Sequence, residues 1–229
     1  RFVEISDALT FKSVVAVFSI IAVISIMVGN LLALMQDNLK RILAYSSIAH
    51  MGYLLIAVIA SFFAVGTVSI EAVTFYLLAY VIMSLGAFGV LSIFSSSQNE
   101  LDSIADYQGL FWRSPWLAAV FTGMLLSLAG IPLTVGFIGK FYVFLAGVET
   151  ELWILLSVLI VGSGIGLYYY LRIVYRMLMP VSGDNILVDT RMENLSTLGV
   201  LAILFVLLLA LGIYPAPIMA IIEAISVHI

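Results

Sequence analysis

The sequence contains no cysteine, and charged residues make up only 10% of its 229 positions. Without cysteine the chain has no disulfide, no thiolate metal ligand and no cysteine nucleophile. Its few basic residues form no patch of the kind that binds nucleic acid. Walker, dinucleotide-binding, zinc and Ser-His-Asp patterns are also absent, so we expect neither a bond-making catalytic site nor a bound metal or cofactor in this chain.

Apolar residues, by contrast, account for 64% of the chain. A membrane-crossing helix needs about 20 mainly apolar residues, and long charge-free runs recur along this sequence. The composition therefore predicts an all-α integral membrane protein with six transmembrane helices. We expect helices at about 13–36, 42–60, 71–95, 115–147, 152–178 and 195–215. Pro215 and Pro217 should end the last helix, which leaves 216–229 as an interfacial tail.

The basic residues are divided unequally between the two sides that the connections reach. One side holds Lys40, Arg41, Arg113, Arg172, Arg176 and Arg191, and the other holds Arg1 and Lys12. Positive charges favour the cytoplasmic side. This asymmetry predicts that the Lys40-Arg41 turn and the loops 95–113 and 180–194 are cytoplasmic, with both ends of the chain periplasmic.

Lys140 is the only charged residue between Ser114 and Val148. A charged side chain within lipid is costly, and such residues are commonly functional and paired. Because removal from water disfavours the ammonium form, a buried lysine can load and unload a proton. The alternative is that Lys140 extends to the outer interface, close to Glu149.

A helix break lies just before Lys140. Pro132 lacks an N–H and clashes with the preceding turn, and Gly130 adds backbone freedom. Ser127 and Thr134 flank this break and offer hydroxyls to freed backbone groups or to water. Gly136, one turn before Lys140, leaves room on the same face for water or a neighbouring side chain.

His50 lies near the centre of the expected helix 42–60, with Ser46, Ser47 and Tyr53 on the same face. Histidine has the one side chain that ordinarily titrates near physiological pH. This face can therefore relay protons, with Lys140 as a companion site. Alternatively, a neutral His50 joins two helices by a hydrogen bond, as polar residues often do in membranes.

Other polar residues allow more than one interpretation. Tyr76, Tyr80 and Ser84 form a stripe that suits either a hydrated path or helix packing. Lys40 is either an orientation charge or the cytoplasmic mouth of a path, and Asp37 is a plausible cap for the helix that follows.

The expected helix 152–178 carries two further features. Gly162 and Gly166 have the spacing of a close helix contact. Tyr168 to Tyr170, followed by Arg172, are typical of an interface anchor.

Three stretches of the chain resemble one known family. Residues Gln36–Tyr53 and Leu128–Phe141 are similar to the antiporter-like membrane subunits of respiratory complex I and to multisubunit sodium/proton antiporters. The stretch Gly166–Arg172 looks most like one particular subunit of bacterial complex I.

The resemblance implies a fold built from two inverted five-helix repeats, each containing one discontinuous helix. Residues 1–180 would form the second repeat, followed by a last span. Lys140 would be the broken-helix lysine of a half-channel, and His50 would lie on a hydrophilic axis beside Tyr45 and Ser47. Because the chain begins without Met, we expect the first repeat to belong to a missing N-terminal half of the same polypeptide.

The resemblance also implies a function in the bacterial inner membrane. We expect a proton-translocating, non-redox subunit of a NADH:quinone oxidoreductase, surrounded by lipid and by other membrane subunits of the complex. NADH, FMN, iron–sulfur clusters and quinone would belong to partner subunits. Two alternatives stay open: a subunit of a multisubunit cation/proton antiporter, and a scaffold whose polar residues only hold helices together.

Overall fold

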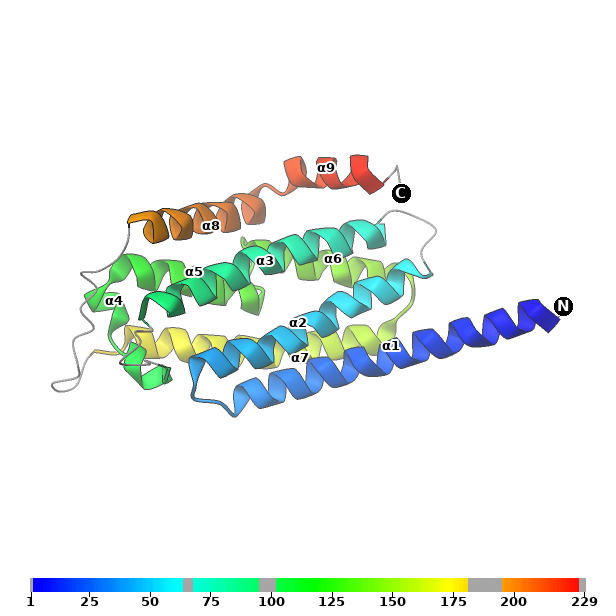
Figure 1. Ribbon diagram of the computed structural model, residues 1–229, viewed down its shortest axis with the longest axis horizontal. Helices are drawn as coiled ribbons and strands as arrows, with labels where there is room; N and C mark the ends of the chain where they lie inside the picture. The colour runs from blue at the N-terminus through cyan, green and yellow to red at the C-terminus, as the bar shows by residue number, and fades with distance from the viewer. Residues whose placement is uncertain (1, 64–67, 95–101, 181–194, 227–229) are drawn as a thin grey trace.

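The computed structural model describes residues 2–63, 68–94, 102–180 and 195–226. All the regular elements within these ranges are helical, and the long ones run side by side along the longest axis (Figure 1). The elements are α1 (Phe2–Leu34), α2 (Leu39–Ser61), α3 (Val68–Phe94), η1 (Ile104–Tyr107), α4 (Leu110–Arg113), α5 (Pro115–Ala129), α6 (Val135–Glu149), α7 (Trp153–Leu178), α8 (Leu195–Ile213) and α9 (Ala216–Ser226). The predicted all-α membrane architecture is confirmed.

Among the described residues, five helices are long and apolar enough to cross a membrane, namely α1, α2, α3, α7 and α8. The expected helix 115–147 is instead two helices of 15 residues each, α5 and α6. The predicted count of six spans therefore holds only if α5 and α6 are counted together as one broken crossing.

Helix α2 begins at Leu39, three residues before the expected start, because of its cap. The side chain of Asn38 accepts a hydrogen bond of 3.0 Å from the Arg41 N–H. The prediction that Asp37 is this cap is wrong. The Asp37 carbonyl instead accepts a 2.9 Å bond from the N–H of Ile104, which ties the α1–α2 turn to η1.

Helix α3 lies at the centre of the bundle and packs against α2, α5, α6, α8 and α9. Helices α1 and α2 form a close antiparallel pair. Gly29 and Gly52 allow this approach, because a Cβ on either residue would clash with the backbone of the opposite helix. The outer faces of α1 and α8 expose large apolar residues such as Ile20, Ile24 and Ile203. Such faces suit contact with lipid.

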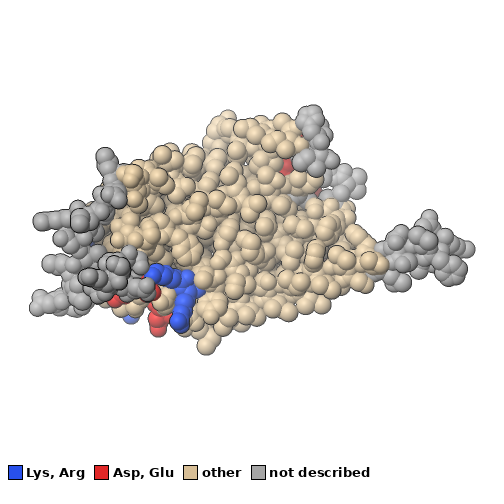
Figure 2. All heavy atoms as spheres, viewed as in Figure 1, with Lys and Arg blue, Asp and Glu red and all other residues tan. Residues whose placement is uncertain are grey.

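At one end of the bundle Figure 2 shows Lys and Arg together with Asp and Glu, beside a broad uncharged surface, and a smaller acidic group appears near the opposite end. Lys40 forms an ion pair of 2.8 Å with Asp102, and an Arg172 nitrogen donates to the Gln36 carbonyl. The Trp112 indole donates to the Leu178 carbonyl at 3.1 Å. The basic side predicted from the sequence is thus one physical end, although Arg1, Arg191 and the loop residues 95–101 and 181–194 lie outside the described residues.

Helix α8 ends at Ile213 and α9 begins at Ala216, so the chain breaks next to Pro215 as expected. Helix α9 packs against α3. It lies at the same end of the bundle as the start of α1 (Figure 1). The assignment of 216–229 to a membrane interface stays a prediction.

Candidate functional site

A break separates α5 from α6, and glycine makes it possible. Gly130 has φ +89, a left-handed conformation that glycine adopts without a Cβ clash. The N–H groups of Gly130 and Ile131 both bond back to the Leu126 carbonyl, at 3.1 and 3.0 Å, which closes the end of α5. Pro132 follows without an N–H, and Leu133 is also left-handed at φ +72.

The start of α6 is capped by a side chain from α5. The N–H of Gly136 donates to Ser127 Oγ at 3.0 Å, and the Ser127 hydroxyl donates to Met83 Sδ at 2.9 Å. Thr134 Oγ1 donates to the Ile131 carbonyl at 2.7 Å and so bonds a backbone group within the break. A Cβ on Gly136 would overlap the Ser127 carbonyl, so the space expected for water is filled by α5 backbone.

Lys140 is buried, with 9% of its surface exposed, and its side chain turns back towards the break. Its Nζ donates to the carbonyls of Leu128 and Ala129, both at 3.0 Å. These carbonyls belong to the last turn of α5, where they lack helical partners and carry the negative end of the helix dipole. Nζ also lies over the Tyr53 ring, 5.2 Å from its centroid.

No carboxylate pairs with Lys140 in the part of the chain that the structure describes. The side chain does not extend to the outer interface, so the alternative based on Glu149 does not describe this geometry. We expected a partner for this charge, and the structure provides two main-chain carbonyls and the Tyr53 ring. The role of Lys140 in proton transfer stays a prediction.

His50 is 2% exposed and lies among three tyrosine rings. Its Nδ1 is 2.8 Å from the Tyr76 hydroxyl, a bond that joins α2 to α3. The rings of Tyr76 and Tyr80 stack on the imidazole at 6.2 and 5.2 Å, and the Tyr53 ring meets it edge-on at 5.6 Å. Because Tyr53 contacts both His50 and Lys140, it joins the two predicted proton-transfer residues.

Asn30 of α1 is part of this polar interior, and sequence reasoning missed it. The side chain is 1% exposed. Its amide donates to the Ile26 carbonyl at 2.8 Å and to the Tyr53 hydroxyl at 3.0 Å, and accepts from the Tyr169 hydroxyl at 3.1 Å. The signal was present, because an amide within an apolar span needs buried partners.

The remaining candidates on α2 lie beside the site and bond to their own helix. Ser46 and Ser47 donate to the Leu43 and Ala44 carbonyls at 2.8 and 2.7 Å. Tyr45 is half-buried against the apolar core. Ser46 also interacts with Tyr170, and Ser47 with Tyr80. Both serines therefore join the tyrosines of the polar interior.

Two candidates lie apart from the cluster. Ser84 donates to the Val81 carbonyl of its own helix at 3.3 Å, so the expected stripe on α3 ends at Tyr80. Lys40 is at the charged end, in its ion pair with Asp102. The structure therefore brings Lys140 and His50 together around Tyr53 and leaves Ser84 and Lys40 outside.

The tyrosine run on α7 divides between surface and interior. Tyr168 is 62% exposed, which suits an interface anchor, whereas Tyr169 and Tyr170 are fully buried. The anchor interpretation is wrong for those two residues. Helical periodicity turns them towards α1 and α2, where Tyr169 bonds Asn30.

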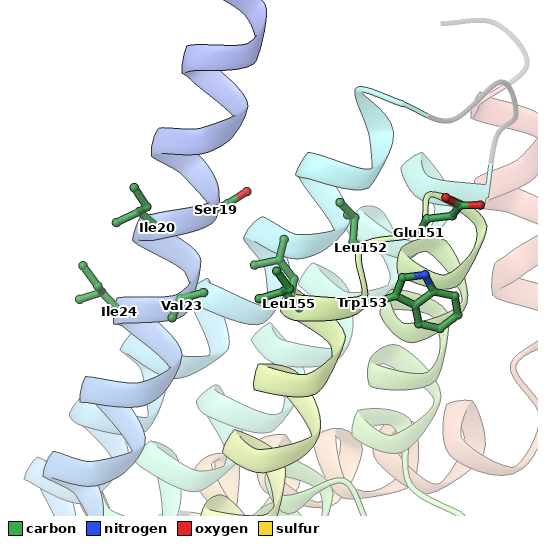
Figure 3. Close-up of a pocket in the computed structure, with 9 residues that line it drawn as sticks. Ser19, Ile20, Val23, Ile24, Glu151, Leu152, Trp153 and Leu155 are labelled. Carbon is green, nitrogen blue, oxygen red and sulfur yellow. The ribbon is translucent and has the colours of Figure 1, made fainter.

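The described residues contain no group of three His, Cys, Asp or Glu side chains that could hold a metal ion. An apolar pocket of about 580 Å³ lies between α1 and the start of α7 (Figure 3). Its lining residues are Ser19, Ile20, Val23, Ile24, Glu151, Leu152, Trp153, Ile154 and Leu155. None of them belongs to the polar cluster.

Comparison with known families gives a match over residues 3–166, to the family described as NADH:quinone oxidoreductase/Mrp antiporter, TM. Two curated relatives are NADH-quinone oxidoreductase subunit N of Methylococcus capsulatus, 50% identical over 218 residues, and of Acinetobacter baumannii, 52% identical over 222 residues. Each alignment covers 95% of this chain but only 43% and 44% of the relative. The chain thus spans less than half the length of these relatives.

Solved structures agree with this match. A chain of respiratory complex I from Thermus thermophilus with bound aureothin superposes with a TM-score of 0.76 and 33% identity, over 90% of this chain and 45% of that one. A chain of the Mrp complex from Dietzia sp. DQ12-45-1b superposes with a TM-score of 0.79 at 20% identity, over 93% and 46%. The second likeness concerns the fold alone.

Proposed function

Because the chain belongs to the NADH:quinone oxidoreductase/Mrp antiporter membrane family, we propose that it forms one proton half-channel of a membrane subunit of a NADH:quinone oxidoreductase. In this proposal Lys140 is the group that loads and unloads protons, and His50 exchanges them with it. The chain itself carries out no redox step.

The burial of Lys140 at the helix break is the observation that carries the proposal. The lysine is removed from water, and no carboxylate holds its charge within the described ranges. Burial in an apolar setting disfavours the ammonium form, while the two carbonyls and the Tyr53 ring favour it. Opposed influences of this kind allow a lysine to change its protonation state.

The hydrogen bonds of Lys140 suit both protonation states. An ammonium has three N–H donors, and a neutral amine keeps two. The two carbonyls of α5 can therefore stay bonded when the proton leaves. Loss of the proton then removes the charge without opening the contact between α5 and α6.

His50 is a suitable exchange partner because the Tyr53 ring contacts both His50 and Lys140. Two cations at short range repel each other, so a proton on one site disfavours a proton on the other. We infer that the pair holds one proton at a time. Tyr76 fixes the imidazole, which can accept from or donate to its hydroxyl according to the tautomer.

The proposal extends to the assembly. NADH oxidation and quinone reduction, with FMN and iron–sulfur clusters, take place in partner subunits. The other repeat lies in the part of the relatives' length that this chain does not cover, and neighbouring membrane subunits continue the polar axis. The Lys40 end faces the bacterial cytoplasm, and both ends of the chain face the periplasm.

A multisubunit cation/proton antiporter is the second candidate function. The Mrp complex superposes at only 20% identity, whereas the complex I subunit N relatives reach 50% and 52%. This difference favours the redox-linked complex. Purification of the full-length subunit with flavin and iron–sulfur proteins supports the first candidate, and purification without them supports the antiporter.

The test of the half-channel replaces Lys140 by Met in the assembled complex. In sealed vesicles, we expect fewer protons translocated per NADH oxidised, because a thioether cannot accept a proton. Lys12→Met is a matched control, since Lys12 is an exposed lysine on α1. Normal proton translocation by an assembled Lys140→Met complex overturns the proposal and favours a scaffold role.

A further inference from the structure

Asn30 has a geometry that connects it to Lys140 through a single side chain. The Asn30 amide bonds the Tyr53 hydroxyl at 3.0 Å, and the ring of the same tyrosine lies 5.2 Å from Lys140 Nζ. We propose that Asn30 is a positioning residue that holds the Tyr53 ring against the Lys140 ammonium group. This inference rests on the half-channel function proposed above.

The orientation of the Asn30 amide is determined by its neighbours. The Ile26 carbonyl, 2.8 Å away, can only accept a hydrogen bond, so the amide nitrogen must face it. The second N–H of that nitrogen reaches the Tyr53 hydroxyl, and the amide oxygen accepts from Tyr169. A flip of the amide would bring two acceptors together, so this network has one arrangement.

Tyr53 is held at both ends of its side chain. Its hydroxyl is bonded by Asn30, and its ring packs edge-on against His50 at 5.6 Å with an interplanar angle of 88°. Tyr53 is 2% exposed, and its ring cannot turn away from Lys140 without leaving one N–H of the Asn30 amide unpaired. An unpaired buried amide is costly, so Asn30 resists that rotation.

Helix α7 is shaped to fit this network. A Cβ on Gly162 would overlap the Ile26 side chain and would lie 2.8 Å from the Tyr53 hydroxyl and 3.0 Å from the Asn30 amide nitrogen. A Cβ on Gly166 would lie 3.5 Å from the Asn30 oxygen and from the Tyr169 hydroxyl. Of the glycine pair that the sequence assigned to close packing, Gly162 thus makes room for Ile26, Tyr53 and Asn30, whereas a Cβ on Gly166 would reach only ordinary contact distance.

The position of the Tyr53 ring affects how readily Lys140 releases its proton. An aromatic ring face attracts a cation, so a correctly placed Tyr53 ring favours the protonated lysine. If the ring moves, the lysine releases its proton more readily. The pH at which proton translocation is half-maximal should then move to a lower value.

The test measures the pH profile of proton translocation in vesicles containing the full complex. We expect Asn30→Leu to lower the midpoint by about half a pH unit, given the usual strength of a cation–π contact. Tyr53→Leu should lower it at least as much. Adding Asn30→Leu to Tyr53→Leu should cause no further shift, because Asn30 acts through the ring.

Two glycine variants provide a matched control. Gly162→Ala should shift the midpoint in the same direction, whereas Gly164→Ala should not, because a Cβ on Gly164 meets nothing within 4 Å. A role confined to helix packing would reduce the amount of complex without moving the midpoint. Additive shifts, or an unchanged midpoint in assembled Asn30→Leu complex, overturn the proposal.

The outcome is separable from that of the half-channel proposal. If Lys140→Met lowers the number of protons translocated per NADH oxidised while Asn30→Leu leaves the midpoint unchanged, the half-channel stands and the positioning role fails. If Lys140→Met has no effect, the half-channel itself fails, whatever Asn30 does.

Discussion

Lys40 and Lys140 carry the same side chain in opposite settings. Lys40 is at the charged end of the bundle, 36% exposed and 2.8 Å from an Asp102 oxygen. Lys140 is in the interior, 9% exposed, and donates to two main-chain carbonyls. The carboxylate and the nearby water both stabilise the charge on Lys40, whereas burial opposes the charge on Lys140. Surroundings, and not residue type, decide which lysine is able to exchange a proton.

The two lysines should differ most in their effect on proton translocation when a substitution keeps the positive charge but prevents proton exchange. Arginine stays protonated in proteins. Lys140→Arg should therefore lower the rate of proton translocation by roughly a hundredfold, the usual contribution of a positioned proton-transfer group. Lys40→Arg should keep the wild-type rate, and proton uptake by vesicles checks both. An active Lys140→Arg complex would contradict the proton-loading role.

A second variant tests the helix break that sets the interior apart. Gly136→Ala would push a methyl group into the Ser127 carbonyl and Met83. We expect a loss of about 3 kcal/mol in stability, the upper range for overpacking. Thermal unfolding of the purified full-length subunit measures it, with Gly199→Ala as the control, because a Cβ there meets nothing within 4 Å. Equal effects of the two substitutions would show that the break tolerates a side chain.

The cap on α6 should contribute less. Ser127→Ala removes the acceptor of the Gly136 N–H and leaves this buried donor unpaired. Such a loss costs about 1–2 kcal/mol. Ser157→Ala, in which an exposed hydroxyl bonded to the Trp153 carbonyl is removed, should cost much less in the same unfolding experiment. If both serine variants are equally stable, α6 does not depend on this cap.

The smallest effect is expected at the charged end. Lys40→Met removes the ion pair with Asp102, which is only partly buried (Lys40 36% and Asp102 20% exposed), and pairs near the surface contribute about 0–1 kcal/mol. Salt already screens such pairs. The difference in unfolding temperature between Lys40→Met and the parent should therefore shrink as ionic strength rises. A large loss of stability that does not depend on salt would mean that Lys40 contributes much more to the fold than a surface ion pair does.

Much of the fold was predictable because hydropathy and charge act locally along the chain. The apolar runs placed the long helices, and Gly130 with Pro132 marked the break, since both residues act on their own backbone. The ends of the helices were predicted less accurately than their positions. Asn38 and not Asp37 caps α2, because the cap depends on which side chain reaches the Arg41 N–H.

The candidate site was predictable only in part. Lys140 and His50 stand out because charged or titratable groups are rare in apolar spans. The contact between Asn30 and Tyr169 could not be predicted in the same way, since the two residues lie 139 positions apart in the sequence. Ser84 has suitable spacing from Tyr80, but its hydroxyl bonds to its own helix.

Membrane class, helix positions and the identity of the unusual charge thus follow from the order of residues, because burial in lipid selects composition segment by segment. The partners of Lys140 follow from helix packing. The end of α5 and the ring of Tyr53 contact Lys140, and the amide of Asn30 holds that ring; these groups come from three separate helices, and only the folded bundle brings them together. Contacts between distant segments depend on the shape of every helix between them, which no local pattern records.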